Sequence, residues 1–181
     1  MLDKKGTTLE HIILLRGVTP NGKNAIPKMS YLVDILIEAD FQRVRTYIQS
    51  GNIILESDLS LEEIREQVHT LIKEKIGADL KMVIKNKNDF AKIVQENPFG
   101  KHYLFDRIHV ILCQNDIQSL PLEKLDSDYG EEEICIGNHC LYLYLPRTAK
   151  RKKLNTNYLE KLLGVDLTMR KLNVVEKLLT K

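Results

Sequence analysis

Apolar and polar positions in the first half of the chain follow two different periods. Short, continuous apolar runs at residues 12–15 and 53–55 indicate buried strands. Between these runs, apolar side chains recur at i, i+3, i+4 and i+7 from Met29, which predicts an amphipathic helix over about 28–39. The full prediction for this half is strand, helix, two strands, helix and strand, over residues 10–16, 28–39, 43–49, 52–56, 61–76 and 80–85.

The second half of the chain repeats this order of elements without repeating the sequence. A connecting helix begins near Asn88 and stops before Pro98. After it, the pattern predicts a strand at 108–112, a short helix or loop at 116–126, a hairpin of 132–136 with 140–145, a helix at 154–163, a short strand at 166–169 and a final helix from about 173.

This order of elements favours an α+β protein made of two ferredoxin-like βαββαβ units, each an antiparallel sheet with helices, plus a C-terminal helix. The predicted boundaries are 1–86 for the first unit, 87–106 for the connecting helix and loop, and 107–181 for the second unit with the C-terminal helix. The continuous apolar runs predict that the central strands are buried on both faces. That prediction argues against an open sheet that reads RNA with its face, and the central strands carry no paired aromatic residues for stacking bases.

Composition limits the partners that the protein can attract. The 181 residues carry a formal net charge of +2, so any affinity for nucleic acid must come from a local patch. The start of the chain is polar and the apolar run at 12–15 is too short for a signal sequence or a membrane span, so we expect a cytoplasmic protein without a membrane partner. In that compartment the three cysteines are expected to be reduced thiols.

One candidate site combines two glycine-rich turns. In a βαββαβ unit, the loop after the first strand and the turn between the second and third strands share one edge of the sheet. This edge gathers cations, amides and glycine, which suits a small anionic ligand that carries phosphate or carboxylate. The alternative is that the glycines build turns and the arginine pairs with a carboxylate; no phosphate-loop spacing is present. The candidate residues are Arg16, Gly17, Lys23, Asn24, Gln49, Ser50, Gly51 and Asn52.

A second candidate site is the basic segment, residues 147–153, which holds five cations in seven positions just before a helix. Such a run can bind a nucleic-acid backbone or an acidic partner. It is also typical of a solvated loop, and no aromatic residues are interleaved with its charges. Its cations are Arg147, Lys150, Arg151, Lys152 and Lys153.

The remaining reactive residues do not form a recognisable catalytic set. Cys135 and Cys140 lie in one hairpin as candidate cross-strand neighbours, with His139 between them, but a zinc site needs about four ligands and no convincing fourth is present. The favoured interpretation is that these cysteines are small reduced residues that fill a sheet. Glutamates 131–133 fit a solvated strand start or a cation site. No nucleophile–base pair can be assigned, and the sequence predicts neither a metal nor a cofactor.

Four short motifs carry a family resemblance. They are residues 14–17, 22–24, 45–52 and 96–99, of which the octapeptide Arg-Thr-Tyr-Ile-Gln-Ser-Gly-Asn ending at Asn52 is the most specific. In these motifs the chain resembles a mainly bacterial family known as domain-of-unknown-function family 1697 (DUF1697), nearly from end to end. The resemblance implies a compact cytoplasmic protein with ferredoxin-like βαββαβ elements, and it implies no established activity, substrate or cofactor. The chain departs from the family pattern in the loop 18–21 and lacks the expected Asn-Trp pair before Asn173.

Overall fold

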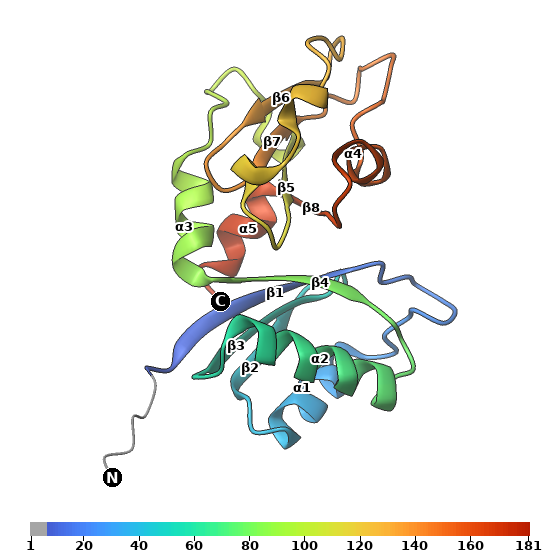
Figure 1. Ribbon diagram of the computed structural model, residues 1–181, viewed down its shortest axis with the longest axis vertical. Coiled ribbons are helices and arrows are strands. Elements are labelled where there is room, and N and C mark those ends of the chain that lie inside the picture. Colours follow the sequence, from blue (N-terminus) through green and yellow to red (C-terminus); the bar gives the residue numbers. More distant parts are fainter. Residues whose placement is uncertain (1–6) are drawn as a thin grey trace. The chain divides into compact units, whose positions relative to one another are not determined.

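The computed structural model describes residues 7–181, which divide into two compact units (Figure 1). One unit comprises the described residues up to Lys87 together with Lys181, and the other comprises Asn88–Thr180. Residues 1–6, at the start of the predicted first unit, lie outside the described residues. Within 7–181 there are two four-stranded antiparallel sheets and five α-helices, which confirms the α+β class.

The first unit has the predicted order of elements, and its sheet has the strand order β2-β3-β1-β4. Every neighbouring pair in this sheet is antiparallel. Figure 1 shows α1 and α2 on the same face of the sheet. The elements are β1 (Leu9–Arg16), α1 (Met29–Glu38), β2 (Gln42–Tyr47), β3 (Asn52–Ser57), α2 (Leu61–Lys75) and β4 (Lys81–Asn86).

Strand β1 is buried along both of its faces. Ile13 and Leu15 belong to the hydrophobic core that the sheet forms with α1 and α2. Ile12 and Leu14 point the other way, because neighbouring residues of a strand alternate between faces, and they are also buried. Burial on both faces, as predicted from the continuous apolar run, is confirmed.

Helix α2 begins and ends at the residues that the sequence indicates. Ser60 accepts a hydrogen bond from the backbone of Glu63, and the Glu63 side chain accepts one from the backbone of Ser60, which completes a capping box. Gly77 ends the helix region with a φ of 84°, a left-handed conformation that glycine adopts without steric cost. The helix packs on the sheet through Ile64, Val68 and Ile72.

The second unit has the same strand order as the first, since β6-β7-β5-β8 places its strands in equivalent positions. The difference lies after its first strand, where two short 3₁₀ turns replace an α-helix. Pro121 lies between these turns and lacks the backbone N–H that a continuous helix needs. The elements are α3 (Lys87–Gln95), η1 (Phe105–Arg107), β5 (Ile108–Leu112), η2 (Ile117–Ser119), η3 (Leu122–Lys124), β6 (Glu133–Ile136), β7 (Leu141–Tyr144), α4 (Thr156–Leu163), β8 (Thr168–Lys171) and α5 (Leu172–Leu178).

Helices cover both faces of the second sheet. Leu141 and Leu143 of β7 share a hydrophobic cluster with Leu159 of α4. Tyr142 points to the opposite face, where its hydroxyl donates a hydrogen bond of 2.6 Å to the backbone carbonyl of Ile93 in α3. Helix α5 packs on β5 and β8. Within residues 7–181, no helix is both long enough and apolar enough to cross a membrane.

Candidate functional site

The turn between β2 and β3 is seated directly on the end of β1. The backbone N–H of Leu15 donates a 2.8 Å hydrogen bond to the carbonyl of Gly51. Gly51 is buried with a φ of 80°, and a Cβ atom added to it would lie only 2.8 Å from Cβ of Leu15. Glycine is therefore required at this position for two reasons, its left-handed backbone and its close approach to β1.

Strand register places Arg16 between two other segments of the sheet edge. The pairing Leu14↔Asn52 and the Leu15–Gly51 hydrogen bond place Arg16 next to the turn between β2 and β3. On its other side Arg16 is paired with Lys81, the first residue of β4. Directly paired residues project from the same face of a sheet, so the two cations are neighbours. Lys81 is a candidate that sequence reasoning missed, since only the β1–β4 register identifies it. We call Arg16, Lys81 and the turn 48–51 the sheet edge.

Asn52 holds the turn together from inside. It is fully buried, and its amide nitrogen donates hydrogen bonds to the backbone carbonyl of Tyr47, at 2.9 Å, and to the hydroxyl of Ser50, at 2.8 Å. Gln49 and Ser50 are exposed at the tip of the turn. Asn52 therefore shapes the sheet edge, and the exposed turn residues are the ones that a ligand can reach.

The loop between β1 and α1 is compact, and it is tied to the segment before β4. Its ends meet where the backbone N–H of Thr19 donates to the carbonyl of Asn24 at 3.2 Å. The side-chain oxygen of Asn24 accepts a 3.3 Å hydrogen bond from the backbone N–H of Asp79. Gly17 and Gly22 have φ values of 90° and 87°. Lys23, which precedes Asn24 in the sequence, is exposed.

The carboxylate of Asp79 faces a histidine and a lysine of α2. It lies 2.8 Å from Nε2 of His69 and 3.2 Å from Nζ of Lys73. The hydrogen bonds from His69 and Lys73 lower the pKa of the Asp79 carboxyl group. His69 and Lys73 thus interact with the Asp79 carboxylate, next to the backbone N–H that anchors the loop.

The basic segment is held by carboxylates. Glu132, which is 4% exposed, accepts hydrogen bonds from the backbone N–H groups of Lys153, at 2.5 Å, and Leu154, at 3.1 Å. Glu131 accepts a 2.6 Å hydrogen bond from the backbone N–H of Lys150. Glu131 and Glu132 therefore bind the backbone of the basic segment. Burial of Glu132 corrects the expected solvated strand start at that residue, whereas Glu131 and Glu133 are exposed and Glu133 begins β6.

Two side chains at the ends of the basic segment lie near aspartates. Arg147 lies 3.6 Å from Asp106, and Lys153 lies 2.5 Å from Asp126. All five cations of the segment are exposed, with Arg151 and Lys152 at its centre. The structure thus gathers the whole predicted set on one surface loop, together with carboxylates that the run of cations did not indicate.

The predicted neighbourhood of Cys135 and Cys140 is wrong. Cys135 is paired with Tyr142, because residues 137–140 form the turn of this hairpin. Burial raises the pKa of the Cys140 thiol to about 12, and burial also raises that of Cys135. In the part of the chain that the structure describes, no group of three or more His, Cys, Asp or Glu side chains could hold a metal ion.

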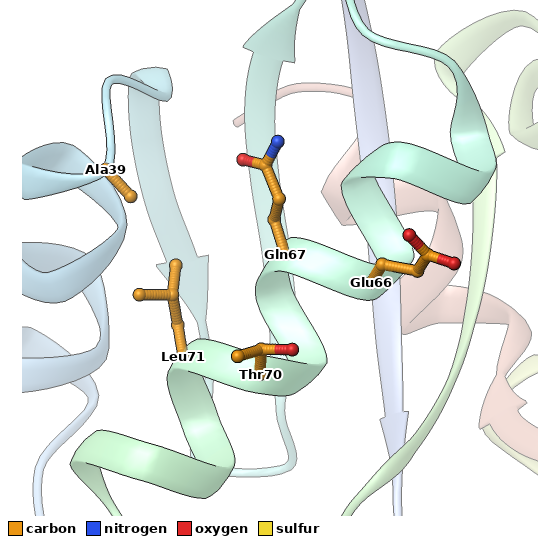
Figure 2. Close-up of a pocket in the computed structure, with 5 residues that line it drawn as sticks. All are labelled: Ala39, Glu66, Gln67, Thr70 and Leu71. Atoms are coloured by element: carbon orange, nitrogen blue, oxygen red, sulfur yellow. The ribbon is translucent and has the colours of Figure 1, made fainter.

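A shallow hollow of about 400 Å³ lies on the helical layer of the first unit (Figure 2). Ala39 follows α1, and the other lining residues belong to α2. None of the predicted site residues lines it. The lining residues are Ala39, Glu66, Gln67, Thr70 and Leu71.

Comparison with known proteins gives a family and a fold. The sequence model of the family described as "Protein of unknown function (DUF1697)" matches residues 9–142. The solved structure of the conserved bacterial protein SP0830 from Streptococcus pneumoniae is similar, with a TM-score of 0.72 over 96% of this chain and 98% of that one. At 19% sequence identity, this similarity shows a shared fold. No curated protein matches the sequence.

Proposed function

Since the chain belongs to the DUF1697 family, whose description names no activity, we propose a function from its geometry: binding of a small anionic ligand. The ligand carries phosphate or carboxylate and binds at the edge formed by residues 16–24 and 49–52. Lys81 joins these residues through its pairing with Arg16.

The cross-strand pairing of Arg16 with Lys81, beside the turn that Gly51 seats on β1, is the observation that carries the proposal. A bound anion would interact favourably with both cations. The guanidinium supplies a planar fork of donors that suits phosphate or carboxylate, and the ammonium adds a point charge.

Titration with inorganic phosphate and with a small dicarboxylate, followed by calorimetry and by NMR, tests the proposal. Arg16→Ala and Lys81→Ala should each weaken phosphate binding by roughly tenfold, the equivalent of one charge-assisted hydrogen bond. Lys161→Ala, which removes an exposed cation in α4, is the matched control and should bind as the unmodified protein does. Equal affinity in all three variants, or no binding in any, would contradict the proposal.

A second candidate function, nucleic-acid binding through the basic segment, is favoured by one observation. Glu131 and Glu132 hold the backbone of the segment, so the exposed Lys150, Arg151 and Lys152 project from a fixed scaffold. The affinity for DNA or RNA should then fall steeply with salt concentration. Replacement of all three cations with Ala should make the plot of log K against log salt concentration less steep, by the equivalent of up to about three phosphate contacts. Absence of any complex at low salt would dismiss this candidate.

The finer fold assignment is part of the same proposal. The order strand, helix, strand, strand, helix, strand and the sheet order β2-β3-β1-β4 support a ferredoxin-like first unit. The equivalent order β6-β7-β5-β8 supports the same assignment for the second unit, with 3₁₀ turns in place of its first helix. Within residues 7–181 the three cysteines form no disulfide, which supports the expectation of a reducing, cytoplasmic location.

A further inference from the structure

Two tyrosines and a carboxylate lie beside the ammonium group at the end of the basic segment, where the Lys153 side chain is 49% exposed. Nζ of Lys153 lies 5.0 Å from the ring centroid of Tyr158 and 5.5 Å from that of Tyr129. The same nitrogen donates a 2.5 Å hydrogen bond to Oδ2 of Asp126. The two rings stand nearly perpendicular, at 78°, with centroids 6.2 Å apart. We call Asp126, Tyr129 and Tyr158 the tyrosine cage.

The walls of the tyrosine cage are fixed by contacts that do not involve Lys153. The backbone N–H of Asp126 donates a 3.0 Å hydrogen bond to the hydroxyl of Tyr129, which is only 7% exposed. The backbone N–H of Tyr158 donates to the capping side chain of Asn155 at 2.9 Å, which fixes the first turn of α4. The Tyr129 hydroxyl and the backbone of Tyr158 are therefore held without the ammonium group.

The chemistry of the tyrosine cage suits a cation. Aromatic rings attract ammonium groups to their faces, and a carboxylate adds a charged acceptor. Burial, followed by the hydrogen bond with Tyr158, raises the pKa of Tyr129 to about 12, which keeps that phenol neutral. The hydrogen bond to Asp126 raises the pKa of the Lys153 ammonium, which keeps this group charged.

We infer that the tyrosine cage is a binding site for a primary ammonium group, with Lys153 as its internal ligand. The site fixes the C-terminal end of the basic segment, and it accepts a small alkylammonium ion when the Lys153 side chain is removed. The inference is independent of the proposed anion site, since it rests on different residues.

Lys153→Ala empties the site and allows a direct test with propylammonium. The chain contains seven tyrosines and no tryptophan, so ring NMR signals of Tyr129 and Tyr158 can be followed without overlap from indole. We expect a saturable shift of both signals in Lys153→Ala, a much weaker response in the unmodified protein, and loss of the response in Lys153→Ala with Asp126→Asn. Propanol, of similar size but neutral, is the control ligand. A folded Lys153→Ala variant with no saturable shift, or an equal response to propanol, would overturn the inference.

Acetylation of the unmodified protein gives a second test that does not depend on folding of a variant. Acetic anhydride reacts with the uncharged amine, so Lys153 should react more slowly than Lys152, which is exposed in the same segment. Mass spectrometry of the two sites measures the ratio of rates. Asp126→Asn should abolish the difference. Equal rates for the two lysines in the unmodified protein would contradict occupation of the cage by Lys153.

Discussion

The two units share a strand order but hold their charged surface segments with opposite chemistry. In the first unit, neutral amides organise the turns: Asn52 donates inside the hairpin, and Asn24 accepts from the segment before β4. In the second unit, the carboxylates of Glu131 and Glu132 hold the backbone of the basic segment. Amides leave the positive charge of the sheet edge unchanged, whereas carboxylates offset the charge of the segment that they hold. A run of cations is therefore a poor measure of local charge, because its anchors carry charge too.

Gly51→Ala should have the largest effect, because it removes the contact that seats the turn on β1. The added Cβ meets Leu15 at 2.8 Å in a left-handed backbone, and we expect a loss of about 3 kcal/mol in the free energy of unfolding. Gly22→Ala has a similar φ but open space around it, so it should cost only about 1 kcal/mol. Urea unfolding of both variants measures the difference, and equal losses would mean that close approach at Gly51 contributes nothing.

Exchange of the two anchor types tests the comparison itself. Asn52→Asp removes both hydrogen bonds that the buried amide donates and sets a charge against two oxygens, at a cost of about 2 kcal/mol. Glu132→Gln keeps an oxygen that accepts from the backbone of the basic segment, so its cost should be smaller, about 1 kcal/mol. Thermal and urea unfolding provide the ranking. A reversed order would show that the amide is not acting as a donor.

Acid should weaken both units through equivalent histidines of their first strands. Burial lowers the pKa of His11 and of His109 in the folded protein. As the pH falls, the unfolded chain binds protons on these histidines more readily than the folded chain does. The free energy of unfolding therefore keeps its full value above the ordinary histidine pKa of about 6.5 and falls as the pH drops below it.

His11→Leu separates the two contributions to this acid sensitivity. His11 is only 3% exposed, whereas Nδ1 of His109 lies 3.0 Å from the carbonyl of Arg107. We expect His11→Leu to reduce the fall in stability between pH 7 and pH 5, measured by urea unfolding at both pH values. An unchanged fall would assign the acid sensitivity to other groups.

Loss of the loop anchors Asn24 and Glu131 should have the smallest effect, confined to one loop in each unit. Asn24→Ala removes the acceptor for the Asp79 backbone, and Glu131→Ala removes the acceptor for the Lys150 backbone. We expect faster hydrogen exchange in the loop 17–27 for the first variant and in the basic segment for the second, with little change elsewhere. Asn21→Ala, in the same loop as Asn24, is the control. Faster exchange throughout a unit would show that these anchors support the core.

Most of the order of elements can be read from the sequence, because local patterns report it. The capping box at Ser60 and the helical stripe of α2 are formed by residues close in sequence. The segment 116–126 shows the limit of such reading. Its pattern fits either a short helix or a loop, and in the structure it forms two 3₁₀ turns with Pro121 between them. The pairing of Cys135 with Tyr142 was missed because the length of a hairpin turn sets its register.

The sequence by itself determined the elements, the burial of the central strands on both faces and the glycine at position 51, since these follow from hydrophobic period and backbone conformation. It also identified the candidate residues of both sites except Lys81. Only the tertiary structure decided which of them are neighbours: Arg16 meets Lys81 through strand register, and Lys153 meets Asp126, 27 residues away, within the tyrosine cage. Contacts between distant segments depend on register and packing, which no local pattern in the sequence encodes.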